Sequence, residues 1–551
     1  MGQTAARENT SHTIAGVAAL GLLLFGGFVY FPGHTYLHSD TQIYLPILDR
    51  LTDPTLYAQD PVALRPHVSY TVYDEAALGL RRLTGLDFVY VLQIQQLVFR
   101  FAGLVGAYLL GRACGLAAPW SVLFASFFGL GATIVGPAVL IAEYEPVPRG
   151  FAVPLLVLGI GLAAHERWLA AGAAVAVAIL YHPPTALPVL MVGAAGLWLA
   201  RKPGDGRWRT GLPIAAAIAA VYVLSKLQAG VSEPQHLFSA ISPALEELQR
   251  LRGSYNFISI WGALWSTHWL FVFGVAIAAW RQLRSVTPPF VSTMALGLTV
   301  FGGLMIPLSH LLLEQAKWSL LPQWQPMRAL LFVTMFAILG AALNGIRAAQ
   351  TGSTWASWPW FAIAFGLTSQ LTLVRLPWQA ITDPVMLVRL LVFIGLALIA
   401  VAAIRWYKPL LLLALALPFY LIPQVAKVRN FGALDHPEIH ALSGWARAHT
   451  GKDDVFQFHA AGQALYPGLF RVYAKRAVYV DWKVGGQVNL LEDFADEWWK
   501  RWQAAGAPKE IDAARLAALG IDYLVVQHKD TIPGREPVYR NSKYLAYRLR
   551  N

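Results

Sequence analysis

The sequence TIAGVAALGLLLFGGFVYF, residues 13–31, is an unbroken apolar run, and the segment PGHTYLHSD, residues 32–40, follows it directly. About 19 apolar residues are enough to cross a bilayer as a helix, whereas the apolar core of a secretory signal is shorter. No small-residue cleavage pattern follows the run. It therefore predicts a retained transmembrane helix, with Asp40 close to where the chain leaves the membrane.

The whole chain has the composition of a membrane protein. Of its 551 residues, 56% are hydrophobic and 13% are charged, against about 25% charged in soluble domains. Further apolar runs bring the predicted number of transmembrane helices to about thirteen, although several runs are shorter than the roughly 20 residues of a full span. These runs are residues 88–110, 120–141, 151–164, 169–181, 186–199, 212–224, 260–280, 290–313, 329–343, 360–374, 385–404 and 409–422.

The basic residues predict the orientation, because loops on the cytoplasmic side of a membrane are enriched in Lys and Arg. With a cytoplasmic N-terminus, every inner loop is basic and the short outer loops hold fewer cations. The inner-loop cations are Arg112, Arg167, Arg201, Lys202, Arg207, Arg209, Arg281, Arg284, Arg347, Arg405 and Lys408. The net charge of +12 is therefore interpreted as membrane topology and not as a nucleic-acid surface. We expect an integral inner (plasma) membrane protein whose C-terminal part lies outside the cytoplasm.

Two parts are predicted, a transmembrane module of residues 1–428 and a small soluble extracytoplasmic α/β domain of residues 429–551. The module is an all-α polytopic bundle with a long first outer loop, residues 32–87. That loop contains two amphipathic stretches, residues 41–51 and 73–83, whose apolar residues recur at helical spacing. Such stretches suit helices that lie along the membrane surface.

The C-terminal domain is predicted to alternate helices and strands. Helices are expected at residues 437–449, 491–502 and 513–519, and strands at residues 455–458, 477–482 and 523–527. The block of residues 471–483 alternates basic and apolar side chains, and we interpret it as a half-exposed strand.

Polar side chains gather on the predicted outer face, where helices end. They come from separate loops but share one side of the membrane, so they predict a cavity lined by carboxylates and cations. The candidates are Asp40, Glu143, Glu145, Arg149, His182, His310, Glu314, Lys317 and Arg328. Each also has a plain structural interpretation, as a solvated helix cap, a turn residue or an interfacial anchor.

This arrangement resembles the GT-C superfamily of polytopic membrane glycosyltransferases. Members place one acidic residue just after the first transmembrane helix and a second in the next outer loop. Asp40 matches the first position, and Glu143 or Glu145 matches the second. The resemblance implies that a sugar moves from a polyprenyl-phosphate-linked donor to a hydroxyl of a glycan, lipid or protein acceptor on the outer face.

Transfer from a phosphate-linked sugar requires a base for the acceptor hydroxyl and cations for the departing phosphate. Under this hypothesis Asp40 is the base. Arg149 and Arg328 bind the phosphate through bidentate contacts, and Lys317 adds a point charge. His310 and Glu314 belong to the substrate-binding side chains.

Glu143 and Glu145 have three open roles. They bind acceptor hydroxyls, hold Arg149 in place, or ligate a divalent metal together with His182. No other cofactor is predicted, and the sequence does not identify a metal.

Two other functions stay open, a lipid or polysaccharide transporter or flippase and a catalytically silent scaffold for envelope assembly. A transporter is expected to place polar groups near the membrane midplane. The chain offers Arg100 there, in the second predicted helix, and a charge at that depth needs an internal partner. We interpret Arg100 as a hydrogen-bonded strut between helices. A cytoplasmic nucleotide-sugar enzyme is disfavoured, because the inner loops lack a glycine-rich phosphate loop.

The predicted orientation has a direct test in intact cells. A cysteine or epitope tag placed in the loop of residues 201–209 should be shielded from an impermeant external reagent, because the basic loop lies inside. A tag placed after Arg429 should be labelled. If external reagent labels both positions, the orientation or the helix count is wrong.

Overall fold

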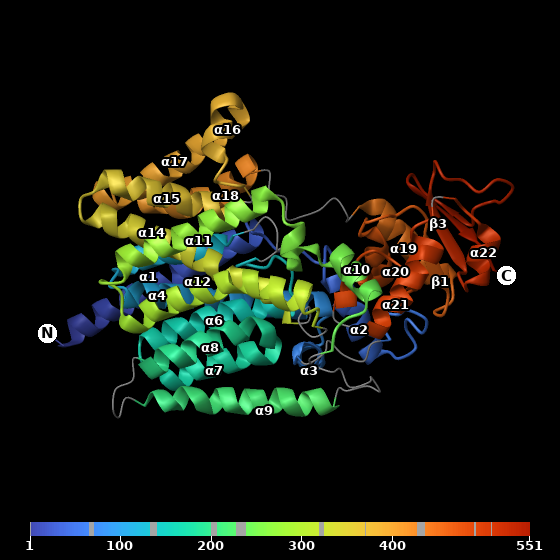
Figure 1. The fold of residues 1–551 in the computed structure, drawn as a ribbon, viewed down its shortest axis with the longest axis horizontal. Helices are drawn as coiled ribbons and strands as arrows, with labels where there is room; N and C mark the ends of the chain where they lie inside the picture. Colours follow the sequence, from blue (N-terminus) through green and yellow to red (C-terminus); the bar gives the residue numbers. More distant parts are fainter. Residues whose placement is uncertain are drawn as a thin grey trace.

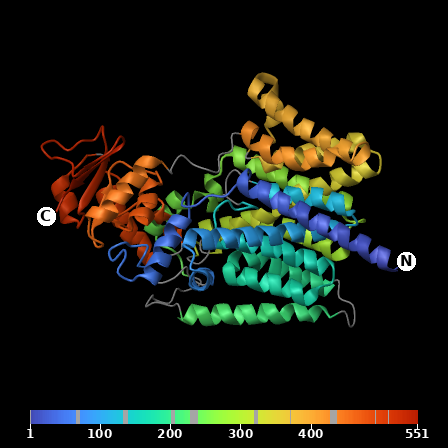
Figure 2. The same cartoon turned by 180° about the vertical axis from the view of Figure 1, so that it is seen from behind.

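The structure is a computed structural model. It describes residues 2–64, 71–132, 140–199, 206–227, 239–318, 324–369, 371–426, 436–489, 492–508 and 510–550. Roughly parallel helices form one end of the elongated molecule, and residues 436–550, the C-terminal region, form the other (Figure 1). The same two parts are seen from behind (Figure 2). The predicted loop cations Arg201 and Lys202 and the predicted boundary at 428/429 lie outside the described residues.

Apolar helices form the bundle, and each predicted apolar run overlaps one of them. They are α1 (Gly2–Val29), α4 (Phe88–Ala113), α5 (Ala118–Leu130), α6 (Pro148–Ala164), α7 (Trp168–Tyr181), α8 (Pro183–Leu199), α9 (Gly211–Leu227), α11 (Ala263–Leu283), α12 (Pro289–Ser309), α14 (Leu330–Gln350), α15 (Thr354–Thr368), α17 (Pro384–Arg405) and α18 (Leu410–Ala426). A short helix, α16 (Leu376–Thr382), connects α15 to α17.

Six described segments are long and apolar enough to cross a membrane, and shorter apolar helices accompany them. They are Phe88–Ala113, Arg207–Leu227, Ala263–Leu283, Pro289–Gln315, Pro326–Gln350 and Pro384–Arg405. The prediction of an integral membrane protein with a mostly helical fold is confirmed. The count of about thirteen spans and the orientation stay predictions.

Close packing of α4 on α6 positions the start of α6. Glycines allow the two helices to approach, because a Cβ at Gly106 would lie 2.4 Å from the backbone nitrogen of Leu158. A Cβ at Gly161 would lie 2.5 Å from the carbonyl oxygen of Gly106. Small residues at such positions let helix backbones pack tightly within a membrane. Larger side chains there would push α6 away from α4.

The first outer loop contains the two predicted helices, α2 (Thr41–Thr52) and α3 (Tyr73–Thr84). Their expected position on the membrane surface stays a prediction. The residues Ile43, Leu45 and Leu48 of α2 are buried within the protein, and α2 packs against α20 (Tyr466–Ala474). The amphipathic pattern was interpreted correctly as a helix, and its apolar side faces the C-terminal region.

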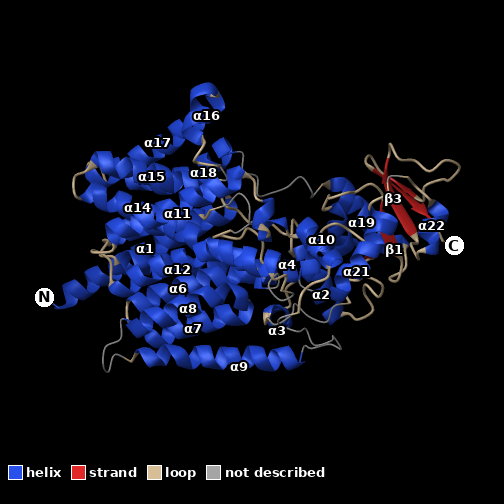
Figure 3. Ribbon diagram, in the orientation of Figure 1, coloured by secondary structure: helices blue, strands red, loops and turns tan. Residues whose placement is uncertain are grey.

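The C-terminal region holds the named strands of the described chain (Figure 3). Its five strands form one sheet in the order β2-β1-β3-β5-β4, with β1 parallel to β2 and β3, and β5 antiparallel to β3 and β4. The elements are α19 (Pro437–His449), β1 (Val455–Phe458), α20, β2 (Ala477–Val478), α21 (Glu492–Arg501), α22 (Ala513–Ala518), β3 (Tyr523–Gln527), β4 (Tyr539–Arg540) and β5 (Tyr544–Arg548). The predicted strand at 523–527 lies in the middle of the sheet.

The prediction of a strand over residues 471–483 is wrong for most of that block. It begins in α20, and only Ala477–Val478 forms a strand. Lys475 ends α20 with a φ of 53°, in the left-handed region. The alternation of basic and apolar residues was misleading, because it predicted that the basic side chains are exposed. The side chain of Arg471 is in fact 1% exposed.

Arg471 belongs to a buried ion-pair cluster that joins the first outer loop to the C-terminal region. Its Nε lies 2.6 Å from a carboxylate oxygen of Asp60, and its Nη2 pairs with Asp481. The three side chains are at most 1% exposed. Asp60 also accepts a hydrogen bond from the backbone N–H of Val478 at 3.1 Å. Because buried charges are costly without partners, the cluster is satisfied only when the loop and the region are docked.

Replacing Arg471 with Met leaves two buried carboxylates without their shared partner. We expect the free energy of unfolding to fall by about 3–5 kcal/mol, as for other broken buried ion pairs. Thermal unfolding of the purified protein in detergent, followed by tryptophan fluorescence, measures the change. Lys475→Met is the matched control, because Lys475 pairs with Asp49 at 3.7 Å and is 31% exposed. It should cost less than about 1 kcal/mol, and equal losses in the two variants would contradict the prediction.

Candidate functional site

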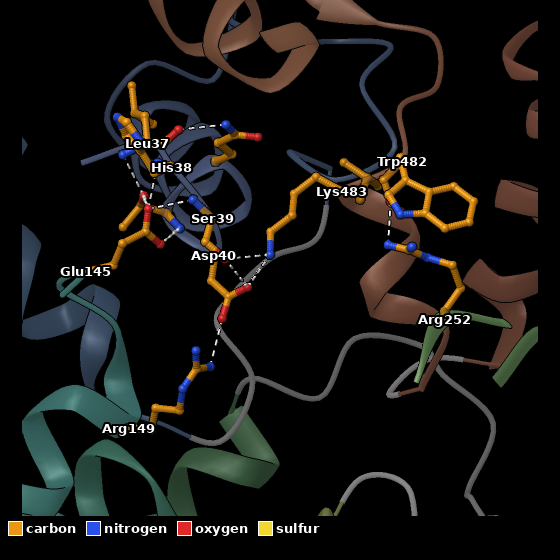
Figure 4. Close-up of polar contacts among 12 residues, drawn as sticks. Leu37, His38, Ser39, Asp40, Glu145, Arg149, Arg252, Trp482 and Lys483 are labelled. Carbon is orange, nitrogen blue, oxygen red and sulfur yellow. Dashed lines mark hydrogen bonds and ion pairs between the residues drawn. The ribbon is translucent and has the colours of Figure 1, made fainter. Parts of the chain in front are cut away.

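Asp40 lies between the helical bundle and the C-terminal region, just before α2 (Figure 4). Its side chain makes no capping hydrogen bond to α2, so both oxygens are available to other groups. One oxygen lies 2.7 Å from Nη1 of Arg149, and the other lies 2.6 Å from Nζ of Lys483. Lys483 also donates to Oγ of Ser39 at 2.9 Å. Two cations from distant parts of the chain therefore hold one carboxylate.

The charge state of Asp40 follows from these contacts. Burial by itself raises the pKa of the carboxyl, but Lys483 and Arg149 outweigh burial and hold this pKa far below its usual range. Asp40 is therefore ionised throughout the neutral range. In this paired state it is also a weak base.

Arg149 sits in the first turn of α6 and has a second carboxylate partner. Its Nε donates to Oε1 of Glu143 at 2.5 Å, and the Glu143 side chain is 4% exposed. Gly150 makes room for this contact, since a Cβ there would lie 2.8 Å from the Cβ of Glu143. Of the roles left open for Glu143, holding Arg149 is the one that this geometry displays.

Glu145 fixes the backbone that carries Asp40. Its Oε1 accepts from the backbone N–H groups of His38 at 2.6 Å and Ser39 at 2.5 Å, and from the hydroxyl of Thr41 at 3.0 Å. Burial raises the pKa of Glu145 to about 7, and the charge of Asp40 acts in the same direction. Because its donors come from residues on both sides of Asp40, Glu145 holds this segment in place (Figure 4).

Arg100 supports the site from inside the bundle. Its Nη2 donates to the carbonyl of Gly33 at 2.8 Å and also to the carbonyl of Glu143. Gln96 donates to the same Glu143 carbonyl at 3.1 Å. The interpretation of Arg100 as a hydrogen-bonded strut is confirmed, with backbone carbonyls of the first and second outer loops as its partners.

His182 and Arg328 lie within electrostatic reach of the same site. Burial, together with the charges of Arg328 and Arg149, lowers the pKa of His182 to about 3. His182 is therefore neutral, and it accepts from the backbone N–H of Thr185 at 3.2 Å if Nδ1 is unprotonated. Among the residues that the structure describes, no partner satisfies the buried Nε and Nη1 of Arg328. Two donors of Arg328, whose charge reaches His182 and Tyr44, are thus available for an anion.

The other three candidates belong to a separate network, the α10 cluster, which surrounds the helix α10 (Pro243–Arg252). Lys317 lies 2.8 Å from Glu246, and His310 lies 3.3 Å from Glu314. Arg250 connects the two carboxylates, at 2.9 Å and 3.5 Å. These contacts join the end of α12 to α10, whereas the expected single cavity placed them with Asp40.

Sequence reasoning missed Lys483. It stands in the block that was interpreted as a half-exposed strand, and 443 residues separate it from Asp40. No local spacing connects two such positions. Within the described ranges, no group of three or more His, Cys, Asp or Glu side chains is arranged to hold a metal ion.

A family model described as Domain of unknown function (DUF6798) matches residues 437–505. Comparison with curated proteins gave no match. Among solved structures, the chain is similar to ArnT from Cupriavidus metallidurans in the apo state, with 12% identity, a TM-score of 0.44 and 98% of each chain covered. It is also similar to ArnT bound to undecaprenyl phosphate, with 14% identity, a TM-score of 0.45 and 98% of each chain covered.

A third similar structure is the arabinofuranosyltransferase AftD from Mycobacteria, with 16% identity and a TM-score of 0.47. The match covers 97% of this chain and 41% of AftD. Similarity at this level identifies no donor or acceptor for this chain.

The ion pairs of Asp40 predict a pH-dependent contribution to stability. Its pKa in the folded protein lies below the ordinary value of 3.8, so ionised Asp40 stabilises the fold above about pH 4 and less as the pH falls further. We expect Asp40→Asn to lower the thermal unfolding temperature between about pH 5 and pH 8, by somewhat less at the upper end, where Glu145 ionises beside Asp40 in the wild type. The difference from the wild type should shrink below about pH 4.

The control for this series is Asp53→Asn. Asp53 pairs with Lys452 at 3.3 Å, but both side chains are exposed, so this substitution should change the unfolding temperature little at any pH. A difference between Asp40→Asn and the wild type that closes between pH 5 and pH 8 would show that the pKa of Asp40 is not depressed.

Proposed function

We propose that this protein is a membrane glycosyltransferase that moves a sugar from a polyprenyl-phosphate-linked donor to an acceptor hydroxyl, with Asp40 at the reacting centre. One observation carries the proposal. A largely buried carboxylate is held between two cations where the apolar bundle meets the C-terminal region, and two buried donors of Arg328 have no partner among the described residues. A lipid-linked phosphate sugar needs that combination of an apolar support, cations and a base.

The chemistry assigns a role to each charge. The acceptor hydroxyl loses its proton to Asp40 as its oxygen bonds to the anomeric carbon of the sugar. The bond from that carbon to the phosphate oxygen breaks, and the electron pair leaves with the phosphate. Arg149 and Arg328 neutralise the growing negative charge on the phosphate. The undecaprenyl phosphate named for one similar structure is a ligand of the proposed class.

The supporting residues position this centre and do not react. Glu145 fixes the backbone at Asp40, and Glu143 holds Arg149. Neutral His182 contributes no charge. We propose that the site opens to the outer face, as the basic inner loops predict, and that residues 429–551 form its extracytoplasmic domain. The α10 cluster lies outside this proposed centre.

The test is sugar transfer by purified protein in nanodiscs, from a panel of polyprenyl-phosphate sugars, with donor affinity measured separately. Asp40→Asn keeps the shape but removes the base, so turnover should fall by about a hundredfold or more with donor binding retained. Arg328→Ala should weaken donor binding first, because it removes a contact made in the ground state and the transition state alike.

Arg281→Ala is the control, since this exposed residue lies in the last turn of α11 and makes none of the contacts of Asp40. It should leave turnover and donor affinity unchanged. Transfer by Asp40→Asn at the wild-type rate would remove Asp40 as the base. If the wild type moves labelled lipid across the bilayer without transferring sugar, the protein is a flippase.

A further inference from the structure

We propose that the C-terminal region completes the reacting centre through Lys483, which binds the donor's phosphate and thereby releases Asp40 to accept the acceptor's proton. This inference rests on the proposed function and assigns a residue that the bundle itself does not contain. It makes the C-terminal region a part of the site and not an appended module.

The first observation is where the side chain of Lys483 ends. Its Nζ lies 2.6 Å from Oδ1 of Asp40 and 2.9 Å from Oγ of Ser39. The lysine side chain is 18% exposed, so the ammonium group has left most of its water for these two partners. Figure 4 shows it reaching from the C-terminal region towards Asp40.

The second observation is that the backbone just before Lys483 is fixed. The carbonyl of Asp481 accepts from the indole N–H of Trp498 at 3.0 Å. The carbonyl of Trp482 accepts from Arg252 at 2.5 Å, and the guanidinium of Arg252 lies 3.9 Å from the ring centroid of Trp482. The flexible four-carbon side chain of Lys483 therefore extends from a fixed backbone. The ammonium group can change partner without movement of the C-terminal region.

The third observation is an asymmetry between the two cations on Asp40. Arg149 also pairs with Glu143 at 2.5 Å, so it stays neutralised if Asp40 is lost. Among the residues that the structure describes, Asp40 is the charged group paired with Lys483. A phosphate entering the site would thus exchange most readily for Asp40 at Lys483. No bond forms or breaks in this step, because one ion pair replaces another.

The exchange has a consequence for reactivity. Lys483 and Arg149 together hold the pKa of Asp40 far below its usual range, despite the opposing effect of burial. Transfer of Lys483 to the phosphate removes one of the two lowering charges, so the pKa of Asp40 rises and its carboxylate becomes a stronger base. The base is then strengthened only when a donor is present.

The test compares Lys483→Met, Lys483→Arg and Lys452→Met in nanodiscs, with undecaprenyl phosphate alone as the binding probe. Lys452 is the matched control, because it also joins the C-terminal region to the first outer loop, through Asp53, but is exposed. Lys483→Met should weaken binding of the probe by about tenfold or more, as expected for a lost charged contact. Lys483→Arg should restore most of the affinity, and Lys452→Met should bind as the wild type does.

A second readout separates the site role from a structural one. In Lys483→Met, the pKa of Asp40 rises in the free protein, so the acidic limb of the kcat/KM profile for transfer should move to higher pH. Unchanged probe binding in Lys483→Met, or equal losses in Lys483→Met and Lys452→Met, overturns the inference. Weakened binding in Lys483→Met, in a protein whose wild type transfers no sugar, supports the Lys483 contact and refutes the proposed function.

Discussion

The carboxylate of Asp40 connects the helical bundle and the C-terminal region electrostatically. Arg149 approaches it from the bundle and Lys483 from the C-terminal region. None of the three side chains is more than 20% exposed, so none keeps enough water to stay charged cheaply alone. The pair of Asp40 with Lys483 therefore stabilises the docked arrangement of bundle and C-terminal region. Separating the two parts would leave Lys483 without its carboxylate and Asp40 with Arg149 alone.

The first outer loop depends on this constraint and reinforces it. At its start, the carbonyl of Gly33 accepts from Arg100 inside the bundle, and Arg100 also binds the carbonyl of Glu143 in the next loop. Further along, Asp60 pairs with the buried Arg471 of the C-terminal region. The loop is therefore anchored on one side to α4 of the bundle and on the other to α20 of the C-terminal region. Its helix α2 buries apolar residues within the protein and packs against α20.

Apolar periodicity predicted the helices because a membrane imposes one solution, the helix, on long apolar runs. Counting the helices also placed the charged residues at the helix ends on one face of the membrane. Asp40 and Glu143 do lie together, because both pair with Arg149. Lys483 could not be found this way, because tertiary docking and not local spacing brings it to Asp40. The block 471–483 was misinterpreted because burial of a paired Arg breaks the rule that charged positions face water. His310, Glu314 and Lys317 were predicted to join the site only because their loop was assigned to the same face of the membrane. In the structure they pair with charged residues of α10.

A site built to bind a phosphate has to remain stable when no phosphate is present. Cations gathered at the end of an apolar bundle repel one another and lose hydration, so an empty anion site needs a substitute anion. Asp40 fills that position between Arg149 and Lys483. The same carboxylate is a weak base while it substitutes for the ligand and a stronger one once the ligand replaces it at Lys483. Under the proposed function, the ion pairs that stabilise the protein without its donor also keep Asp40 a weak base until the donor has bound.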